Sequence, residues 1–355
     1  MSTFPLPIFR PRTIAPDLAQ NHTVAFMTSI STIPEQSGND TPRPHLVISG
    51  DDGSIFKIAY LPDERVVTQS WSGVRVWNLQ SAKQEGTSIE HEIAESAVTR
   101  DGTKIIVNKY GGRIKVWDVE SHKLSKAWTH EEGSAMAISP DDQLIAVGGQ
   151  TVGIYTTERE RVNSAETGSC ALSLSFSPDG NKLACGTQKD IRIYDIKTGT
   201  LVLGPLDGHD DEVIDVLWSR DGSRLFSASF DKTIRCWDSN TGEQIGQPWT
   251  GHTGTIYSLS LSPDGMLLAS SSEDGTIRFW DSAHGRPVRQ HLHHDAPVWS
   301  VSFSPSGEFV ASGGEDGYIY VAGTSSEFHS SSCSYSLHVH FRIGIYRIAA
   351  NSGFP

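Results

Sequence analysis

The sequence predicts an all-β protein built as a ring of seven similar sheets. Six β-type runs end in an aromatic residue at intervals of 38 to 43 residues, and a seventh run ends in a degenerate copy. Turn sequences separate short runs rich in β-branched and aromatic residues, and no segment has a convincing helical pattern. One repeat of this length cannot bury its own apolar face, so neighbouring copies must stack. The endings are Trp77-Asn78, Trp117-Asp118, Tyr155-Thr156, Tyr194-Asp195, Trp237-Asp238, Trp280-Asp281 and Ala322-Gly323.

Residues 1–43 form a proline-rich leader. Frequent prolines prevent a continuous helix and disfavour strand pairing, so we expect a mostly irregular segment. The prolines concerned are Pro5, Pro7, Pro11, Pro16, Pro34 and Pro42.

Each repeat from residue 44 onward follows one template, which is clearest at residues 251–281. There we expect strands at 256–261, 267–272 and 276–280. Ser-Pro-Asp-Gly and Asp-Gly turns should join them, because aspartate and glycine suit tight turns and glycine readily adopts a positive φ. A fourth strand should follow each ending, as in residues 242–250.

Residues 323–355 depart from the template. Alternating apolar residues between 335 and 345 indicate a strand. Three alternatives stay open: an outer strand for the last sheet, an exposed tail, or an aberrant continuation of the coding sequence.

Composition narrows the function and the location. A net charge of −13 argues against a nucleic-acid backbone or an anionic membrane as the main partner. No apolar run reaches the ~20 residues that a membrane helix needs, and no cleavable signal begins the chain. We therefore expect a cytoplasmic or nuclear protein, or both. The cysteines lack metal-type spacing and should be reduced, chiefly as small buried side chains; they are Cys170, Cys185, Cys236 and Cys333.

On these repeats the chain resembles the WD-repeat β-propeller family over residues 44–322. The resemblance implies a seven-bladed β-propeller of four-stranded antiparallel blades around a central channel. Sequence repeats and blades are offset in this family. Residues 45–49 stand where an outer strand precedes each repeat, so they should pair with blade seven and close the ring.

The same resemblance implies a buried chain of four hydrogen-bonded residues within a blade. Such a chain satisfies otherwise isolated polar groups. The sets are His209, Ser227, Asp231 and Trp237 in blade five, and His252, Ser270, Asp274 and Trp280 in blade six. Blade seven offers His294, Ser312 and Asp316 but has Ala322 at the tryptophan position.

These His-Ser-Asp sets also invite interpretation as a hydrolase. We favour a structural role, because the sets recur at equivalent positions and the sequence shows no nucleophile elbow or oxyanion loop. His291, His293 and His294 resemble metal ligands, yet a histidine cluster on a loop is usually solvated. We expect no enzymatic activity, no cofactor and no bound metal.

The favoured function is a non-catalytic scaffold that binds proteins or peptides on the upper propeller face. The candidate contacts are Trp71, Tyr110, Phe230, Phe56, Tyr257, Trp299, Glu273 and Glu315. Exposed aromatic residues with a charged rim are typical of interaction hot spots. Phe56, Tyr257 and Trp299 could instead simply pack between blades, whereas the other three aromatics stand beside turns and are harder to bury.

Two alternatives to a general scaffold stay open. One is a reader of chromatin or of basic peptide tails, using cation–π contacts. The other is an enzymatic propeller, for which no catalytic residues can be placed. In each case we expect a monomeric ring within a complex, without direct nucleic-acid or membrane binding.

Overall fold

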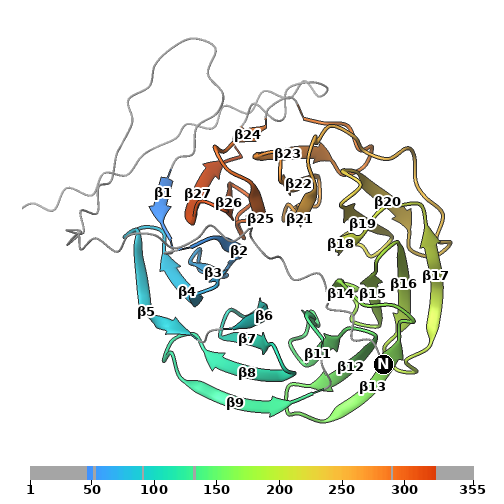
Figure 1. Ribbon diagram of the computed structural model, residues 1–355, viewed down its shortest axis with the longest axis horizontal. Coiled ribbons are helices and arrows are strands. Elements are labelled where there is room, and N and C mark those ends of the chain that lie inside the picture. Colours follow the sequence, from blue (N-terminus) through green and yellow to red (C-terminus); the bar gives the residue numbers. More distant parts are fainter. Residues whose placement is uncertain (1–45, 51–52, 90–91, 131–132, 289–290, 325–355) are drawn as a thin grey trace, which may run out of the picture. The chain divides into compact units, whose positions relative to one another are not determined.

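Seven antiparallel sheets, the blades, are arranged in a ring (Figure 1). The computed structural model describes residues 46–50, 53–89, 92–130, 133–288 and 291–324. Every regular element in these residues is a strand, so the predicted all-β, seven-bladed propeller is confirmed. The leader and the alternating tail segment lie outside the described residues, and the predicted domain boundaries stay predictions.

In each blade the strands follow one another from the inner to the outer edge. Blade one has β2 (Ile55–Tyr60), β3 (Val66–Ser70), β4 (Gly73–Asn78) and β5 (Lys83–Ile89); blade two has β6 (Ile93–Val98), β7 (Lys104–Lys109), β8 (Arg113–Asp118) and β9 (Leu124–Thr129). Blade three has β10 (Ala135–Ile138), β11 (Leu144–Gly148), β12 (Thr151–Thr156) and β13 (Arg161–Glu166); blade four has β14 (Ser173–Phe176), β15 (Lys182–Gly186), β16 (Asp190–Asp195) and β17 (Leu201–Asp207). Blade five has β18 (Val213–Trp218), β19 (Arg224–Ser229) and β20 (Ile234–Asp238); blade six has β21 (Ile256–Leu261), β22 (Leu267–Ser272), β23 (Thr276–Asp281) and β24 (Leu292–His293). Blade seven has β25 (Val298–Phe303), β26 (Phe309–Gly314), β27 (Tyr318–Gly323) and β1 (Leu46–Ser49).

The recurrent turn between the first and second strands is held by its own side chains. In blade six the Ser262 hydroxyl donates to Asp264 Oδ1, and the Leu267 N–H donates to Ser262 Oγ at 2.9 Å. Gly265 closes the turn at a φ of 75°, a conformation that costs glycine little. This chemistry explains why the repeated turn sequence marks strand boundaries so well.

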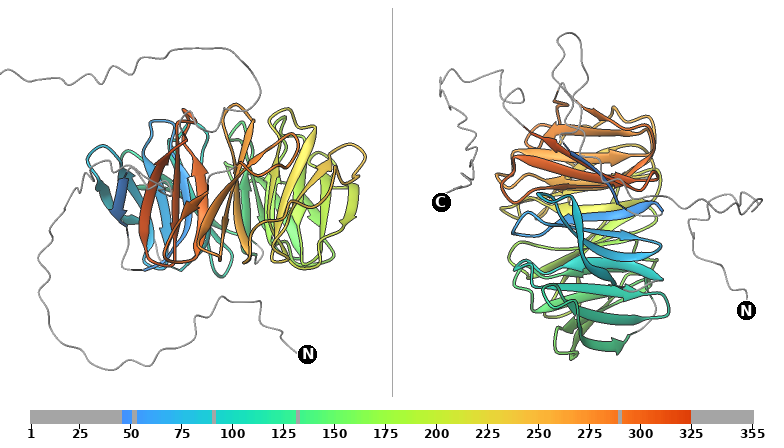
Figure 2. Two further views of the ribbon diagram at one scale, coloured as in Figure 1. Left: turned by 90° about the horizontal axis from the view of Figure 1, so that it is seen from above. Right: turned by 90° about the vertical axis from the view of Figure 1, so that its left-hand side faces the viewer.

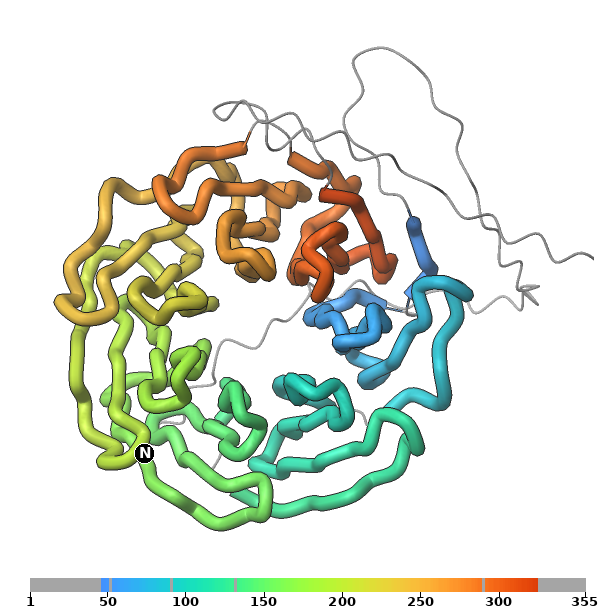
Figure 3. The backbone as a smooth tube through the Cα atoms, turned by 180° about the vertical axis from the view of Figure 1, so that it is seen from behind, coloured from blue at the N-terminus to red at the C-terminus, as the bar shows by residue number. Residues whose placement is uncertain are grey.

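The first strand of the chain closes the ring. β1 pairs antiparallel with β27, with Leu46 opposite Val321 and Ser49 opposite Tyr318. Figure 3 shows this blue strand beside the red end of the last blade. The outer strand that the sequence places before the first repeat is therefore confirmed.

The outer edge of blade five departs from the expected template. Residues 242–250 contact β20 only through isolated bridges, Trp237 with Gln244 and Ile234 with Trp249. Pro248 has no N–H to donate to a ladder, and Gly246 has a φ of 73°. The predicted fourth strand is consequently an irregular segment in this blade.

The hydrophobic core lies between neighbouring blades. Trp237 of blade five packs in one cluster with Ile193 of blade four, and Trp280 of blade six packs with Phe226 of blade five. Cys185 and Cys236 are buried in strands as free thiols, as the sequence predicts. Because each blade buries its face against the next, the ring is the unit of stability.

Candidate functional site

Two sets of loops share one face of the ring, which we call the upper face. The turns between second and third strands bond to the loops that enter the inner strands: the Phe230 N–H donates to the Glu212 carbonyl, and the Glu273 N–H to the Thr255 carbonyl. Figure 2 shows the ring edge-on, with strand ends gathered at two opposite faces. Side chains from all seven blades can therefore meet on this face.

Five inner strands contain a β-bulge near their upper ends. In β2 the pairing register shifts between Ile55 and Lys57, so Phe56 is the extra residue, and the same shift recurs in β6, β18, β21 and β25. A bulge re-aims its side chain, and all five bulged residues line a central cavity. They are Phe56, Ala94, Ile214, Tyr257 and Trp299.

Three of the predicted contact residues form one aromatic group across blades seven and one. The Phe56 ring stacks on Trp299 at 4.9 Å between centroids and meets the Trp71 ring edge-on at 4.7 Å. Trp71 occupies a two-residue turn between Ser70 and Gly73 and is 48% exposed. The group is thus half-buried by contacts between blades, yet it presents a tryptophan to solvent.

A second aromatic pair lies across blades five and six. Phe230 meets Tyr257 edge-on at 6.3 Å, so Phe230 is half-buried although its place beside a turn suggested an exposed ring. Burial, followed by the carboxylates of Glu273 and Glu315, raises the pKa of the Tyr257 hydroxyl to about 12. Both glutamates are exposed, so this part of the face combines aromatic rings with negative charge.

Tyr110 lies apart from both groups. Tyr110 is 58% exposed on the upper-face turn of blade two, and its ring contacts no other aromatic ring among the described residues. Burial and the Glu95 carboxylate raise the pKa of its hydroxyl. Its rank beside Trp71 as a leading contact stays a prediction.

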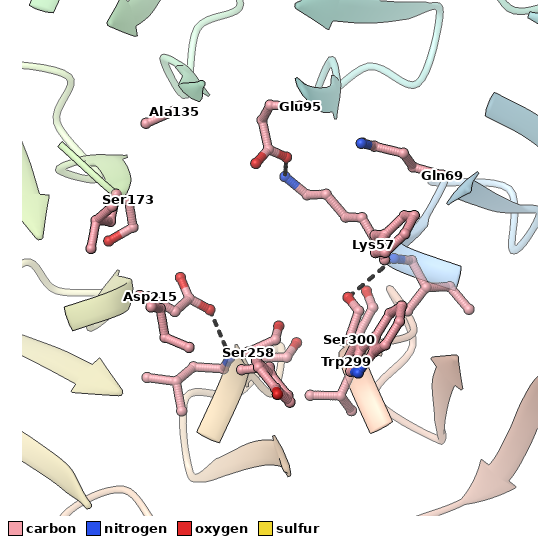
Figure 4. Close-up of a pocket in the computed structure, with 18 of the residues that line it drawn as sticks. Lys57, Gln69, Glu95, Ala135, Ser173, Asp215, Ser258, Trp299 and Ser300 are labelled. Atoms are coloured by element: carbon pink, nitrogen blue, oxygen red, sulfur yellow. Dashed lines mark hydrogen bonds and ion pairs between the residues drawn. The ribbon is translucent and has the colours of Figure 1, made fainter. Parts of the chain in front are cut away.

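The central cavity, of about 360 Å³, contains charged residues that the sequence interpretation missed (Figure 4). One position below the bulges, the Lys57 ammonium forms an ion pair with Glu95. The Asp215 carboxylate points into the opening from the far side (Figure 4). The sequence did contain a signal for these charges. The position after the bulge is charged in three inner strands, whereas two others have Ser258 and Ser300 there.

The hydrogen-bonded sets of blades five and six have the arrangement that the resemblance implies. His209 Nδ1 lies 2.7 Å from Asp231 Oδ2, and His209 Nε2 lies 2.7 Å from Ser227 Oγ, which also accepts from Trp237 Nε1 at 2.9 Å. The matching distances in blade six are 2.9, 2.8 and 2.8 Å. Each serine hydroxyl is buried under an indole, a position that suits a structural role and obstructs substrate access.

These contacts fix the ionisation of the two aspartates. Burial alone would raise the pKa of Asp231, but hydrogen bonds from His209 and Thr233 outweigh it and hold that pKa below its usual range. Hydrogen bonds from His252 and Thr276 hold the pKa of Asp274 below its usual range in the same way. Both carboxylates are therefore ionised at neutral pH.

Blade seven uses its equivalent residues differently. Asp316 Oδ2 accepts from the Tyr320 hydroxyl at 2.7 Å, while His294 Nε2 lies 3.4 Å from Ser312 Oγ. The His294 ring packs edge-on against Tyr320 at 4.3 Å, whereas His291 and His293 pack edge-on against each other. In blades five and six the equivalent aspartate is hydrogen-bonded to the histidine. In blade seven the Asp316 carboxylate accepts from the Tyr320 hydroxyl instead.

Blade two lacks the serine acceptor. Val107 occupies the place of Ser227, as their opposite partners in the third strands show. Within the described residues the buried Trp117 indole N–H has no hydrogen-bond partner. In blade one Thr68 fills this role and accepts from Trp77 at 2.8 Å.

Comparisons with known proteins agree with this architecture. Residues 170–332 match the family model of the first β-propeller of IFT122. A WD repeat-containing protein, SL1-17 of Schistosoma mansoni, is 32% identical over 143 residues, which are 38% of this chain and 46% of that protein. These sequence matches and the seven-bladed fold support membership of the WD-repeat β-propeller family.

Further WD-repeat relatives share similar lengths of sequence. The cross-pathway control WD-repeat protein 2 of Flammulina velutipes is 34% identical over 131 residues, covering 33% of this chain and 42% of that protein. The small ribosomal subunit protein RACK1y of Oryza sativa subsp. japonica is 31% identical over 138 residues, covering 36% and 41%. The chain thus spans less than half the length of each of these three relatives. Among the described residues, no helix has the length and apolar character that crossing a membrane requires.

Proposed function

We propose that this WD-repeat protein is a non-catalytic scaffold that binds other proteins through its upper face, with the group of Trp71, Phe56 and Trp299 at the centre of the contact. Its family supports a scaffold for protein interactions in general. One relative is named as a protein of the small ribosomal subunit, which is a larger assembly.

The observation that carries the proposal is the exposure of Trp71 on a rigid support. A tryptophan at the tip of a turn costs solubility, and here it packs against Phe56, which is itself stacked on Trp299. A pre-ordered aromatic side chain loses little entropy on binding. Truncation of such an anchor typically costs about 2 kcal/mol or more of binding free energy.

The test compares Trp71→Ala with Met266→Ala. Met266 is also a large apolar residue, 62% exposed, but it follows the turn between the first and second strands, on the opposite face. Proteins captured from cells by the wild type should be lost at least tenfold with Trp71→Ala and kept with Met266→Ala. Equal capture by both variants would place the binding surface elsewhere.

A second candidate, the reader of basic peptide tails, is favoured by one observation. The carboxylates of Glu273 and Glu315 lie close enough to Tyr257 to raise the pKa of its hydroxyl. An aromatic ring beside two carboxylates suits a lysine or arginine. Glu273→Gln with Glu315→Gln should weaken binding to an array of basic peptides; unchanged binding would dismiss this candidate.

We also propose that the protein acts inside the cell, in the cytoplasm, the nucleus or both, as a single ring within a complex. The buried free thiols of Cys185 and Cys236 fit a reducing compartment. Imaging of the tagged full chain tests the location. Light scattering of the purified protein tests the monomeric state.

A further inference from the structure

The Asp215 carboxylate is the least compensated charge in the central cavity. Its Oδ2 accepts a hydrogen bond from the Leu259 N–H at 2.7 Å, and a backbone hydrogen bond from Val216 also favours its charged form. Lys57, the cation on the cavity wall, is already paired with Glu95 across the opening (Figure 4). Burial raises the pKa of Asp215 to about 7, and Lys57 lowers it only in part. Because the carboxylate points into the opening and Lys57 is paired elsewhere, Asp215 can still pair with a positive group that enters the cavity.

The surroundings of Asp215 define the chemistry of that ligand. Above it, the bulged Phe56, Tyr257 and Trp299 make an apolar, aromatic wall on the side of blades six, seven and one. At its own level the cavity wall is polar and includes the hydroxyl-bearing Ser258. A chain that enters from the upper face therefore meets aromatic rings first and a carboxylate at the end. A flexible apolar stem that ends in one positive charge fits this order.

We propose that the central cavity is a binding site for one lysine side chain of the polypeptide that docks on the upper face, with the ammonium group paired to Asp215. The polypeptide source rests on the proposed function, whereas the cavity chemistry does not. Lysine is favoured over arginine because the Leu259 N–H already takes one of the acceptor sites of Asp215 Oδ2, which leaves fewer sites for a contact through both oxygens. A guanidinium binds carboxylates best through both oxygens, while an ammonium is a point charge that needs one.

The experiment uses small probes and the full chain. Protein labelled with [15N]leucine is titrated with Nα-acetyl-lysine methylamide, and the Leu259 amide resonance is followed by NMR, because that N–H is bonded to Asp215. The norleucine analogue keeps the stem but lacks the charge. We expect a saturable shift with the lysine probe and at least a tenfold weaker response with the norleucine probe. Equal responses would overturn the proposal.

Two variants make the test specific. Asp215→Asn keeps an acceptor for the Leu259 N–H and should lower lysine-probe affinity at least tenfold, whereas Asp207→Asn, an exposed change on β17, should not. Full affinity in Asp215→Asn would refute the site. An arginine probe that binds as tightly as lysine would refute the choice of lysine.

A third variant separates this proposal from the proposed function. Trp71→Ala should keep the lysine probe, because the probe needs only the cavity, even where it loses protein partners. If Trp71→Ala binds the probe and also keeps its protein partners, the cavity site is supported and the docking surface is refuted. If Trp71→Ala loses its partners and the protein does not bind the probe, the docking surface is supported and the cavity site is refuted.

Discussion

Replacing Asp215 with asparagine should stabilise the protein, and the gain should depend on pH. The pKa of Asp215 is raised from 3.8 to about 7, so the folded state favours the neutral acid. As the pH rises, the Asp215 side chain therefore loses its proton at a lower pH in the unfolded chain than in the folded protein. Stability contributed by the neutral acid is therefore fully present below about pH 4 and is lost between pH 4 and pH 7.

The shift sets a ceiling on the size of the effect. About three pKa units at 1.36 kcal/mol each give about 4 kcal/mol above pH 7. The carboxylate opens onto a cavity that admits water, and Lys57 is near enough to attract it, so we expect about 2 kcal/mol. Asparagine retains the oxygen that accepts from the Leu259 N–H, so the hydrogen bond between blades five and six persists.

The measurement is the free energy of unfolding in urea at pH 5, 6, 7 and 8 for the wild type, Asp215→Asn and Asp207→Asn. The first variant should gain on the wild type as pH rises and then level off above pH 7. The exposed control should follow the wild type throughout. A gain that does not change with pH, or a loss of stability at pH 8, would show that the Asp215 charge does not burden the folded state.

Three further changes test other parts of the ring. Asp274→Ala leaves a buried histidine without its carboxylate acceptor and should cost about 1–3 kcal/mol in urea unfolding. Asp316→Ala removes the acceptor of the Tyr320 hydroxyl and of the exposed Tyr318 N–H, but of no buried histidine, and should cost less. Equal costs would contradict the distinction between blades six and seven. Removal of residues 1–43 should leave a cooperatively melting ring, while removal of 1–50 deletes β1 and should abolish cooperative melting. A cooperative melt of the chain that starts at residue 51 would show that another segment closes blade seven. Val107→Thr supplies the missing acceptor for the blade-two indole and should raise stability by about 0.5–1.5 kcal/mol in thermal melts, so a lower melting temperature would show that the hydroxyl is not directed at the indole.

The architecture was predictable because the evidence for it is local and repeated. Turn side chains such as Ser262 and Asp264 bond within one turn, so their sequence alone marks the strand ends. The pairing of β1 with β27 could be predicted for the same reason, since residues 45–49 occupy the sequence position that the outer segment has in each repeat. An outer strand is present in five of the other six blades, blade five being the exception, and this repetition constrains the seventh.

The site was only partly predictable because it depends on pairing between strands. A β-bulge is a property of two strands, and nothing within the residues of β2 alone shows that Phe56 is the extra one. The half-burial of Phe230 likewise depends on Tyr257 of the next blade. The cavity charges Lys57, Glu95 and Asp215 come from three blades, so their convergence appears only when the ring is closed.

The pairing of β1 with β27 also imposes a delay during protein synthesis. Ser49 finds its partner, Tyr318, about 270 residues later in the chain. At a translation rate of ~5–20 residues per second, β1 leaves the ribosome roughly 15–50 s before its partner strand exists. During that interval Val47 and Ile48 belong to a strand with no sheet to join, and six growing blades lack their closing contact. Until the last blade is made, the nascent chain therefore has unpaired strand edges that could pair with other chains, and a chaperone would be most useful during this interval.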